Sequence, residues 1–542
     1  MTSEEEEGHV RSSQASWRRT TSWIGRLTLA AACAATVAAC GSDSDSDGGS
    51  SNAASGTEAA AVGEGIKGPE NVVAGGTLKV GVPAPPASLD PTLSNRGGNY
   101  IYGTFSETLT KYDDEGKLSK DGLLTDWERT DRNTWRFTLR EGVKFHNGEP
   151  FDAEAAKFTI LAQRDVEGSI LKTYFLNVTD VEVVDPTTIE VKTKTPQFNI
   201  PDQLGTVYAL PPKAYEKAGA DFAKNPIGTG PFMFASQKAG QSISVKANPD
   251  YWRGAPKLEG IEFSFPKDAA QRLALVQSGA LDLGFELAHQ QGEEAASSGL
   301  QVLSVKTSLK ELAFITGEKA PFDDPVVREA AALAIDRNEI VEGIFGGTNV
   351  AEGGLLNMLP GQKVPAVVEA NAAKAKELLA GKSPEIDLTW IAGYNTGIDE
   401  VTSAMRAQLE AAGFKVKPNP VDQATLIKQA LGRELSGIWM YGAVPNVPDP
   451  NFYVQGFMTE TSISGNCVRP AWDKAAAEAL EAEDAEAAQA IYDDLNTQAV
   501  VDEHCYVPLY FETSHFAAGD KVGGFKFSVL RYSDFYEAGF TE

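Results

Sequence analysis

The stretch NPIGTGPFMFASQKAGQSISVKANPDYWRGAPKLEGIEFSFPKDAAQRLALVQSGALDLGF, residues 225–285, decides the fold. Its apolar residues alternate with polar ones in three short runs, which predicts three strands: 232–235, 243–246 and 261–265. Apolar residues then take helical spacing over 268–277, and Gly279 ends the helix. Leu281–Leu283 indicates a further short, buried strand. The stretch therefore predicts a mixed α/β layer.

Three motifs of this stretch, in the order PIGTGPF, NPDYW and QSGALDL, resemble those of the extracytoplasmic solute-binding proteins of peptide/nickel ABC importers, solute-binding family 5. Further similar motifs lie before and after it: SLDP at 88–91, FSETLTKYD at 105–113, LREGVKFHNGEPFDAEAAKFT at 139–159 and FDDPVVREAAALAIDRNEIVEGIFGG at 322–347. The resemblance covers roughly residues 75–527. It implies an α/β fold of the two-lobed, type II periplasmic-binding-protein kind, with an extra inserted domain and a hinge between the lobes.

The resemblance also implies how the chain is divided. Residues 76–99, 207–308 and 507–542 would form the first lobe, 100–206 a domain inserted into it, and 309–506 the second lobe. A βαβ unit is expected in the second lobe, from the strand 386–391 to the strand 414–416.

The first 40 residues are predicted to be a lipoprotein signal segment. Basic residues precede an apolar run, 27–39, that is too short to span a bilayer as a mature helix. Val37-Ala-Ala-Cys40 resembles a bacterial lipobox, in which Cys40 would be lipidated; the alternative is a plain secretory signal with an incidental cysteine. Residues 41–75, rich in Ser, Asp, Gly and Ala, are expected to be a disordered tether. The expected location is the extracytoplasmic face of the cell membrane.

Charge and cysteine content limit the partners. The formal net charge of −27 argues against nucleic acid as a partner, because phosphates require a basic surface. Once Cys33 leaves with the signal and Cys40 carries lipid, Cys467 and Cys505 remain in an oxidising compartment. A disulfide between them is expected, and two buried thiols are the alternative. The chain is expected to be a monomer.

Motifs of catalysis and metal binding were not found. The sequence has no HExxH and no GxSxG, and GKS at 381–383 lacks the upstream glycine of a phosphate-binding loop. Five histidines leave little for a metal cage, and His146, His504 and His515 are interpreted as structural residues. We therefore expect no enzyme activity, no cofactor and no resident metal.

The segment 438–450, IWMYGAVPNVPDP, resembles the family's W-x-a-D-y-x-D-P loop. The resemblance implies that the first Asp of this loop pairs with the α-amino group of a peptide in peptide-binding members. Asn446 stands at that position here, and an amide brings no charge to such a pair. Free peptides are thereby in doubt as the ligand, and neutral or differently charged solutes stay open.

Further candidate ligand-binding residues combine polar groups with aromatic rings, as a solute cleft requires. They are Tyr100, Glu286, Tyr394, Asn395, Tyr441 and Tyr510. Tyr394 and Asn395 follow a strand that is expected to be parallel, at the end where α/β sheets bind ligands. Ordinary packing or surface exposure is the alternative for each residue.

The functional hypothesis is a lipid-anchored substrate-binding component of an ABC importer, which captures a peptide or other small-molecule solute and delivers it to permease and ATPase subunits. A metal-chelate importer is a variant of this hypothesis. A secreted α/β hydrolase and a ligand sensor without a transport role are the alternatives.

Overall fold

The computed structural model describes residues 66–93, 99–445, 447–460, 462, 467 and 469–542. The predicted signal segment with Cys40, most of the predicted tether and Asn446 lie outside the described residues. In the described part, no helix has the length and apolar character needed to cross a membrane.

Two long antiparallel strands, β13 (Gln301–Ile315) and β18 (Tyr506–Ala518), form the middle of an eleven-stranded sheet. The order across the sheet is β16-β15-β17-β13-β18-β12-β2-β11-β10-β9, and β14 pairs with β18 beside this path. The other strands are β16 (Lys415–Val421), β15 (Glu385–Ile391), β17 (Ile438–Ala443), β12 (Leu283–Leu287), β2 (Thr77–Gly81), β11 (Gly260–Ser264), β10 (Ser242–Ala247), β9 (Phe232–Lys238) and β14 (Val350–Ala351).

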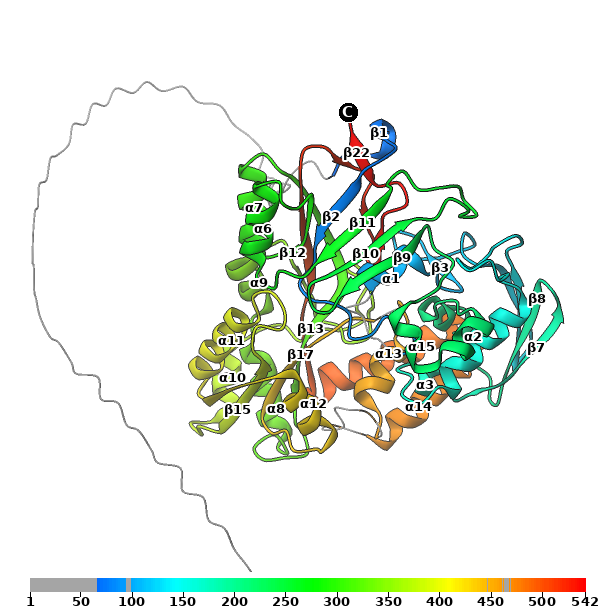
Figure 1. Cartoon of the computed structure of the whole chain (residues 1–542). Helices are drawn as coiled ribbons and strands as arrows, with labels where there is room; N and C mark the ends of the chain where they lie inside the picture. The colour runs from blue at the N-terminus through cyan, green and yellow to red at the C-terminus, as the bar shows by residue number, and fades with distance from the viewer. Residues whose placement is uncertain (1–65, 94–98, 446, 461, 463–466, 468) are drawn as a thin grey trace, which may run out of the picture. The chain divides into compact units, whose positions relative to one another are not determined.

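Apart from β14, the remaining strands attach to opposite ends of this pair. β12 joins the end of β18 at His515–Ala518, whereas β17 joins the end of β13 at Lys310–Ile315. Between these ends the register of β13 against β18 shifts, from Lys306 to Lys310. Figure 1 shows β13 running from the strands β2, β11 and β10 to the group around β17 and β15.

The strands predicted in the deciding stretch are confirmed, with one shift. β9 and β10 form an antiparallel hairpin, and β11 continues the sheet beside β10. Asp268 caps the predicted helix α6 (Ala269–Gln277). The strand expected at Leu281 begins only at Leu283, because the Leu281 N–H still donates to the carbonyl of Leu275 at 3.0 Å and completes the end of α6.

The glycines of the PIGTGPF motif allow a close backbone approach. A Cβ on Gly228 would lie 2.1 Å from the carbonyl oxygen of Phe105, and one on Gly230 would lie 2.8 Å from that of Thr104. These carbonyls belong to α1 (Asn99–Phe105), which packs against β9. His146 holds the same loop, since its Nε2 lies 3.0 Å from the Gly230 carbonyl. This contact supports the structural role predicted for His146.

Five helices accompany the β15–β17 part of the sheet: α8 (Pro325–Ala334), α9 (Arg337–Phe345), α10 (Ala372–Leu379), α11 (Ile398–Ala412) and α12 (Gln423–Leu431). The predicted N-caps are present, because the side chain of Asp324 accepts from Val326 N and that of Asp336 accepts from Asn338 N and Glu339 N. α11 connects the parallel strands β15 and β16, which confirms the predicted βαβ unit.

A separate four-stranded antiparallel sheet has its own apolar core. It contains β5 (Leu124–Asp131), β6 (Thr134–Leu139), β8 (Thr188–Thr193) and β7 (Val178–Asp185), and α2 (Ala153–Asp165) packs against β7. Shorter elements surround the two sheets: β3 (Lys111–Tyr112), β4 (Leu118–Ser119), α3 (Lys172–Phe175), α4 (Ile200–Gln203), α5 (Pro212–Ala218), α7 (His289–Ser297), α13 (Asn451–Tyr453), β19 (Val522–Gly523), β20 (Lys526–Phe527) and β21 (Ser533–Asp534).

The folded part begins earlier than predicted. Residues 66–75 were assigned to the tether, yet they contain the short helix η1 (Pro69–Asn71) and the strand β1 (Val72–Val73). β1 pairs with β22 (Gly539–Thr541) at the other end of the chain. These backbone hydrogen bonds give the segment order that its composition alone does not predict.

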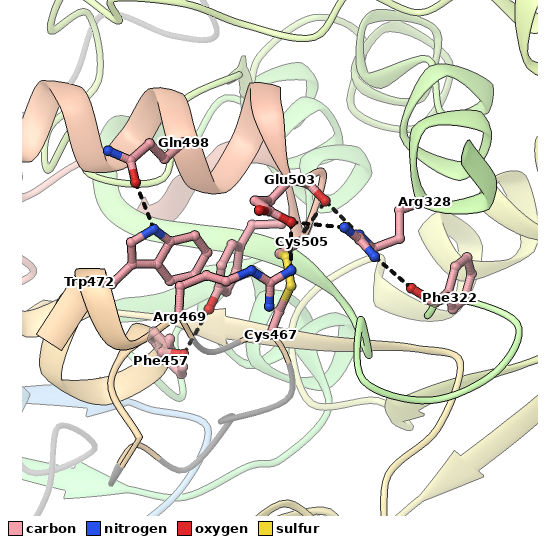
Figure 2. The surroundings of a disulfide bond; sticks show 10 residues. Phe322, Arg328, Phe457, Cys467, Arg469, Trp472, Gln498, Glu503 and Cys505 are labelled. Carbon is pink, nitrogen blue, oxygen red and sulfur yellow. Dashed lines mark hydrogen bonds and ion pairs between the residues drawn. A yellow bond between two sulfur atoms is a disulfide. The ribbon is translucent and has the colours of Figure 1, made fainter. Parts of the chain in front are cut away.

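The Ala-rich stretch 472–500 forms two helices, α14 (Pro470–Leu480) and α15 (Ala485–Thr497), because Asp484 caps the second one. Beside them a disulfide joins Cys467 to Cys505, with Cα atoms 5.9 Å apart. Figure 2 shows Arg328 and Arg469 beside this bond, both directed at Glu503 with N–O distances of 2.9 and 2.6 Å.

The disulfide is expected to stabilise the fold. Its 38-residue separation predicts that the Cys467→Ala/Cys505→Ala variant loses about 4 kcal/mol of unfolding free energy, because the open chain gains conformational entropy. Urea denaturation with and without a reducing agent measures this loss. Reduction should destabilise the wild type and leave the double variant unchanged; equal stability of oxidised and reduced wild type would contradict the prediction.

Candidate functional site

Polar side chains gather at the middle of the β13–β18 pair. Tyr510, Glu512 and Ser514 are alternate residues of β18, so they share one face of the strand. Glu311 of β13 is the register partner of Tyr510. Charged groups in the centre of a sheet are costly to bury unless they are paired, so each of these groups requires a partner.

Arg531 is the centre of this cluster. Its guanidinium pairs with the carboxylate of Glu286 and lies 3.4 Å from that of Glu512. It also donates to Tyr100 Oη at 2.6 Å and Ser514 Oγ at 3.0 Å. Tyr100 in turn donates to Glu286. The structure thus brings together two residues singled out in the sequence, Tyr100 and Glu286, around a cation that was not.

The backbone holds both members of the main ion pair in an unusual conformation. Glu286 has φ 48° and Arg531 has φ 67°, values that residues other than glycine seldom adopt. Arg272 supports Glu286 by donating to its carbonyl at 2.6 Å and to that of Phe285 at 2.7 Å. Such strained positions cluster at functional sites, where surrounding contacts over-determine them.

Glu311 is the second centre of the cluster. Its side chain is 1% exposed, and Asn395 Nδ2 donates to Oε2 at 2.8 Å. The opposite residue on β17 is Gly442, where a Cβ would lie 2.8 Å from that oxygen and 2.0 Å from Asn395 Nδ2. Glycine at 442 therefore makes room for the contact between the carboxylate and the amide.

Two carboxylates of the cluster, those of Glu311 and Glu512, are shifted toward their neutral forms. Burial, opposed by the hydrogen bond from Asn395 and aided by the charge of Glu512, raises the pKa of Glu311 to about 8. Burial also raises the pKa of Glu512, although Arg531 opposes this. Burial raises the pKa of the Tyr510 hydroxyl well above its usual range. The charges of Glu311 and Glu512 act in the same direction.

The other aromatic candidates lie apart from the carboxylates. Tyr441 stands opposite Leu312, so it points to the sheet face away from Glu311. Its ring stacks on that of Tyr394, with 6.2 Å between centroids, and Tyr394 is 42% exposed. Together the predicted residues fall into three groups: Tyr100 with Glu286, Asn395 with Tyr510 around Glu311, and Tyr394 with Tyr441.

Sequence reasoning missed Glu311, Glu512 and Arg531. Glu311 had a visible signal, since it is a carboxylate inside the otherwise strand-like run Leu309–Ile315. Arg531 had none, because its importance depends on long-range contacts from a loop near the C-terminus.

A cavity of about 300 Å³ lies elsewhere, and none of the predicted ligand-binding residues lines it. Glu107 at its wall accepts from Tyr251 Oη at 2.8 Å and from Trp252 Nε1 at 3.1 Å. These contacts join the FSETLTKYD and NPDYW motifs and explain both as packing features. The wall of the cavity combines aromatic rings with charged groups of both signs, among them Tyr112, Asp113, Asp121, Arg253 and Lys526.

Among the described residues, no group of three or more His, Cys, Asp or Glu side chains could hold a metal ion. His515 is buried and its Nδ1 lies 2.8 Å from Ser304 Oγ. Its burial lowers its pKa to about 4.

The raised pKa of Glu311 predicts a pH effect on stability. Between about pH 4.5 and 8 the folded protein binds a proton at Glu311 that the unfolded chain releases, so the unfolding free energy falls as pH rises. Glu311→Gln should reduce this fall by roughly 2 to 4 kcal/mol, because one pKa unit corresponds to about 1.4 kcal/mol.

Chemical denaturation at pH 5 and pH 8 measures this difference. Asp449, whose pKa burial raises to about 7, contributes with the same sign, so some pH dependence should remain in the variant. The exposed Glu478→Gln is the matched control and should behave like the wild type. An unchanged slope in Glu311→Gln would refute the assignment.

Comparisons with known proteins agree with this architecture. The family model described as "Bacterial extracellular solute-binding proteins, family 5 Middle" matches residues 120–465. A protein of Brucella ovis that is named for peptide binding in an ABC transporter is 28% identical over 406 residues, 70% of this chain and 76% of the relative.

Solved structures show the same fold. The ABC transporter substrate-binding protein CtaP of Listeria monocytogenes has a TM-score of 0.77 at 21% identity, covering 86% of this chain and 100% of its own. The periplasmic binding protein DppA of Helicobacter pylori, in complex with the peptide STSA, has a TM-score of 0.74 at 20% identity, covering 87% and 99%. The predicted two-lobed, type II α/β fold is confirmed by this likeness. The chain belongs to the bacterial extracellular solute-binding proteins, family 5.

Proposed function

We propose that this protein captures a peptide-type solute between its two lobes and delivers it to the permease and ATPase subunits of an ABC importer. Its family, and the names of CtaP, DppA and the Brucella relative, support a substrate-binding role in ABC transport. The peptide bound in the DppA structure and the name of the Brucella relative support a peptide as the solute.

The observation that favours capture at the centre of the molecule is the buried polar cluster on β13 and β18. The carboxylates of Glu286 and Glu512 lie around the Arg531 guanidinium, and Glu311 interacts electrostatically with Glu512. Burying so many polar groups weakens a fold, so their placement favours a role in recognising a solute over a role in stability. Uptake without chemical change of the solute is part of this proposal.

The two crossing strands suggest how capture would work. Their register shift, at Lys306–Lys310, lies between the ends to which the two halves of the sheet attach. Bending there would move one lobe against the other with few changes in the rest of the sheet. A solute that contacts both lobes binds the closed form better and so shifts the population toward it.

We retain the predicted organisation as part of this proposal. Residues 76–99, 207–308 and 507–542 would form the first lobe, 100–206 its inserted domain and 309–506 the second lobe. Lipidation of Cys40 would hold the protein at the extracytoplasmic face of the membrane, and the rest of the chain would act as a monomer.

Peptide capture predicts direct binding. The tetrapeptide Ser-Thr-Ser-Ala should bind with one peptide per chain in native mass spectra and raise the unfolding free energy, by about 2.7 kcal/mol at a hundredfold excess over Kd. Lys474→Ala removes only an exposed ion pair with Glu478 and should bind equally. The proposal of a peptide solute fails if mixed tetrapeptides give neither an adduct nor a stability shift.

Lipid anchoring predicts where the protein is found in cells. Cys40→Ser should move it from the membrane fraction to the soluble extracytoplasmic fraction, because no lipid can be attached. Cys33→Ser alters the same segment and should leave the protein in the membrane fraction. Fractionation followed by immunoblotting measures both, and a membrane-bound Cys40→Ser protein would exclude this anchor.

A further inference from the structure

We propose that Glu311, Tyr510 and Glu512 form a subsite that receives a positively charged nitrogen of the solute, an ammonium or a guanidinium group. This inference rests on the proposed function and specifies the class of solute. It assigns to Glu311 of β13 the charge recognition for which the sequence analysis offered only Asn446, an uncharged residue.

The first reason is an imbalance of charge. Arg531 pairs with Glu286 and Glu512, whereas Glu311 has no ion pair with any described residue. Asn395 is the hydrogen-bond donor to its side chain, and an amide cannot neutralise a carboxylate. Glu286 and Glu512 share one guanidinium, and Glu512 acts on Glu311 as a like charge, so an arriving cation would supply the positive charge that Glu311 lacks.

The second reason is an unused hydroxyl. Tyr510 is 2% exposed, and its Oη has no hydrogen-bond partner among the described residues. It is the register partner of Glu311, and both Glu311 and Glu512 act on it electrostatically. A buried hydroxyl without a partner is costly, and its oxygen can accept a hydrogen bond from an N–H of the solute.

The protonation of Glu311 adds a distinctive signature. Because its pKa is about 8 without ligand, Glu311 is mostly protonated at pH 7, and a cation beside it favours the ionised form. Binding a cationic solute should therefore release a proton to the buffer. Calorimetry in phosphate and in Tris detects such release as a difference in apparent binding enthalpy.

The test compares three probes by calorimetry on the purified mature protein: tetra-alanine, N-acetyl-tetra-alanine, and N-acetyl-Ala-Ala-Lys-Ala. We expect a cationic probe to bind about tenfold or more tightly than the neutral one, since charge-assisted hydrogen bonds to a buried carboxylate are strong. Preference for tetra-alanine identifies the amino terminus as the source of the cation, and preference for the lysine probe identifies a side chain.

Variants assign the preference to the subsite. Glu311→Gln should reduce the discrimination between cationic and neutral probes to about threefold or less and abolish proton release, because its amide carries no charge. Glu107→Gln alters a half-buried glutamate at the wall of the separate cavity and should retain the discrimination. Tyr510→Phe keeps the ring and should weaken cation binding about threefold or more, which tests the subsite even if Glu311→Gln does not fold.

Each remaining outcome counts against the cationic subsite, either alone or together with peptide capture. Equal binding of all three probes would refute the cationic subsite and leave peptide capture intact. Discrimination that persists in Glu311→Gln, or that is lost only in Glu107→Gln, would also refute it and in the latter case place the cation at the other cavity. Binding of none of the probes would refute peptide capture together with the subsite.

Discussion

The pairing of β13 with β18 is the constraint on which the rest of the structure depends. Every other strand of the large sheet reaches the middle of the molecule through β12, β14 or β17, each of which pairs with one of these two strands. Because β12 and β17 attach at opposite ends of the pair, separate apolar clusters form at its two ends. The polar side chains, which are costly to bury in an apolar core, lie at the middle of the pair, between these ends.

The sequence predicted local structure well wherever a short stretch contains its own signal. Alternation located the β9–β10 hairpin, and capping aspartates located α8 and α9. The end of α6 was misjudged because Leu281 completes the helix terminus instead of starting β12. The order of β1 depends on pairing with β22, at the far end of the chain, and no local pattern reports such a contact.

The candidate site was predictable only in part, for the same reason. Tyr100 and Glu286 were chosen singly, and what makes them a unit is Arg531, more than 200 residues away in sequence from either. Asn395 and Tyr510 were likewise chosen without the residue between them, Glu311. The signal available in the sequence was a charged residue, Glu311, inside an apolar strand. Its role can be interpreted only when its three-dimensional partners are known.

Lys310 and Glu311 show why the partners matter more than the charge itself. They are adjacent and both buried, one a base and the other an acid, yet strand alternation turns them to opposite faces of the sheet. Lys310 Nζ donates to the carbonyls of Gly354 and Leu355, at 2.8 and 3.1 Å, and lies over the ring of Phe511. These hydrogen bonds hold that loop, although burial lowers the pKa of Lys310 to about 7. Glu311, next to it, has one amide donor and an unpartnered tyrosine hydroxyl as its neighbours, so its charge is left for a group that the chain itself does not supply.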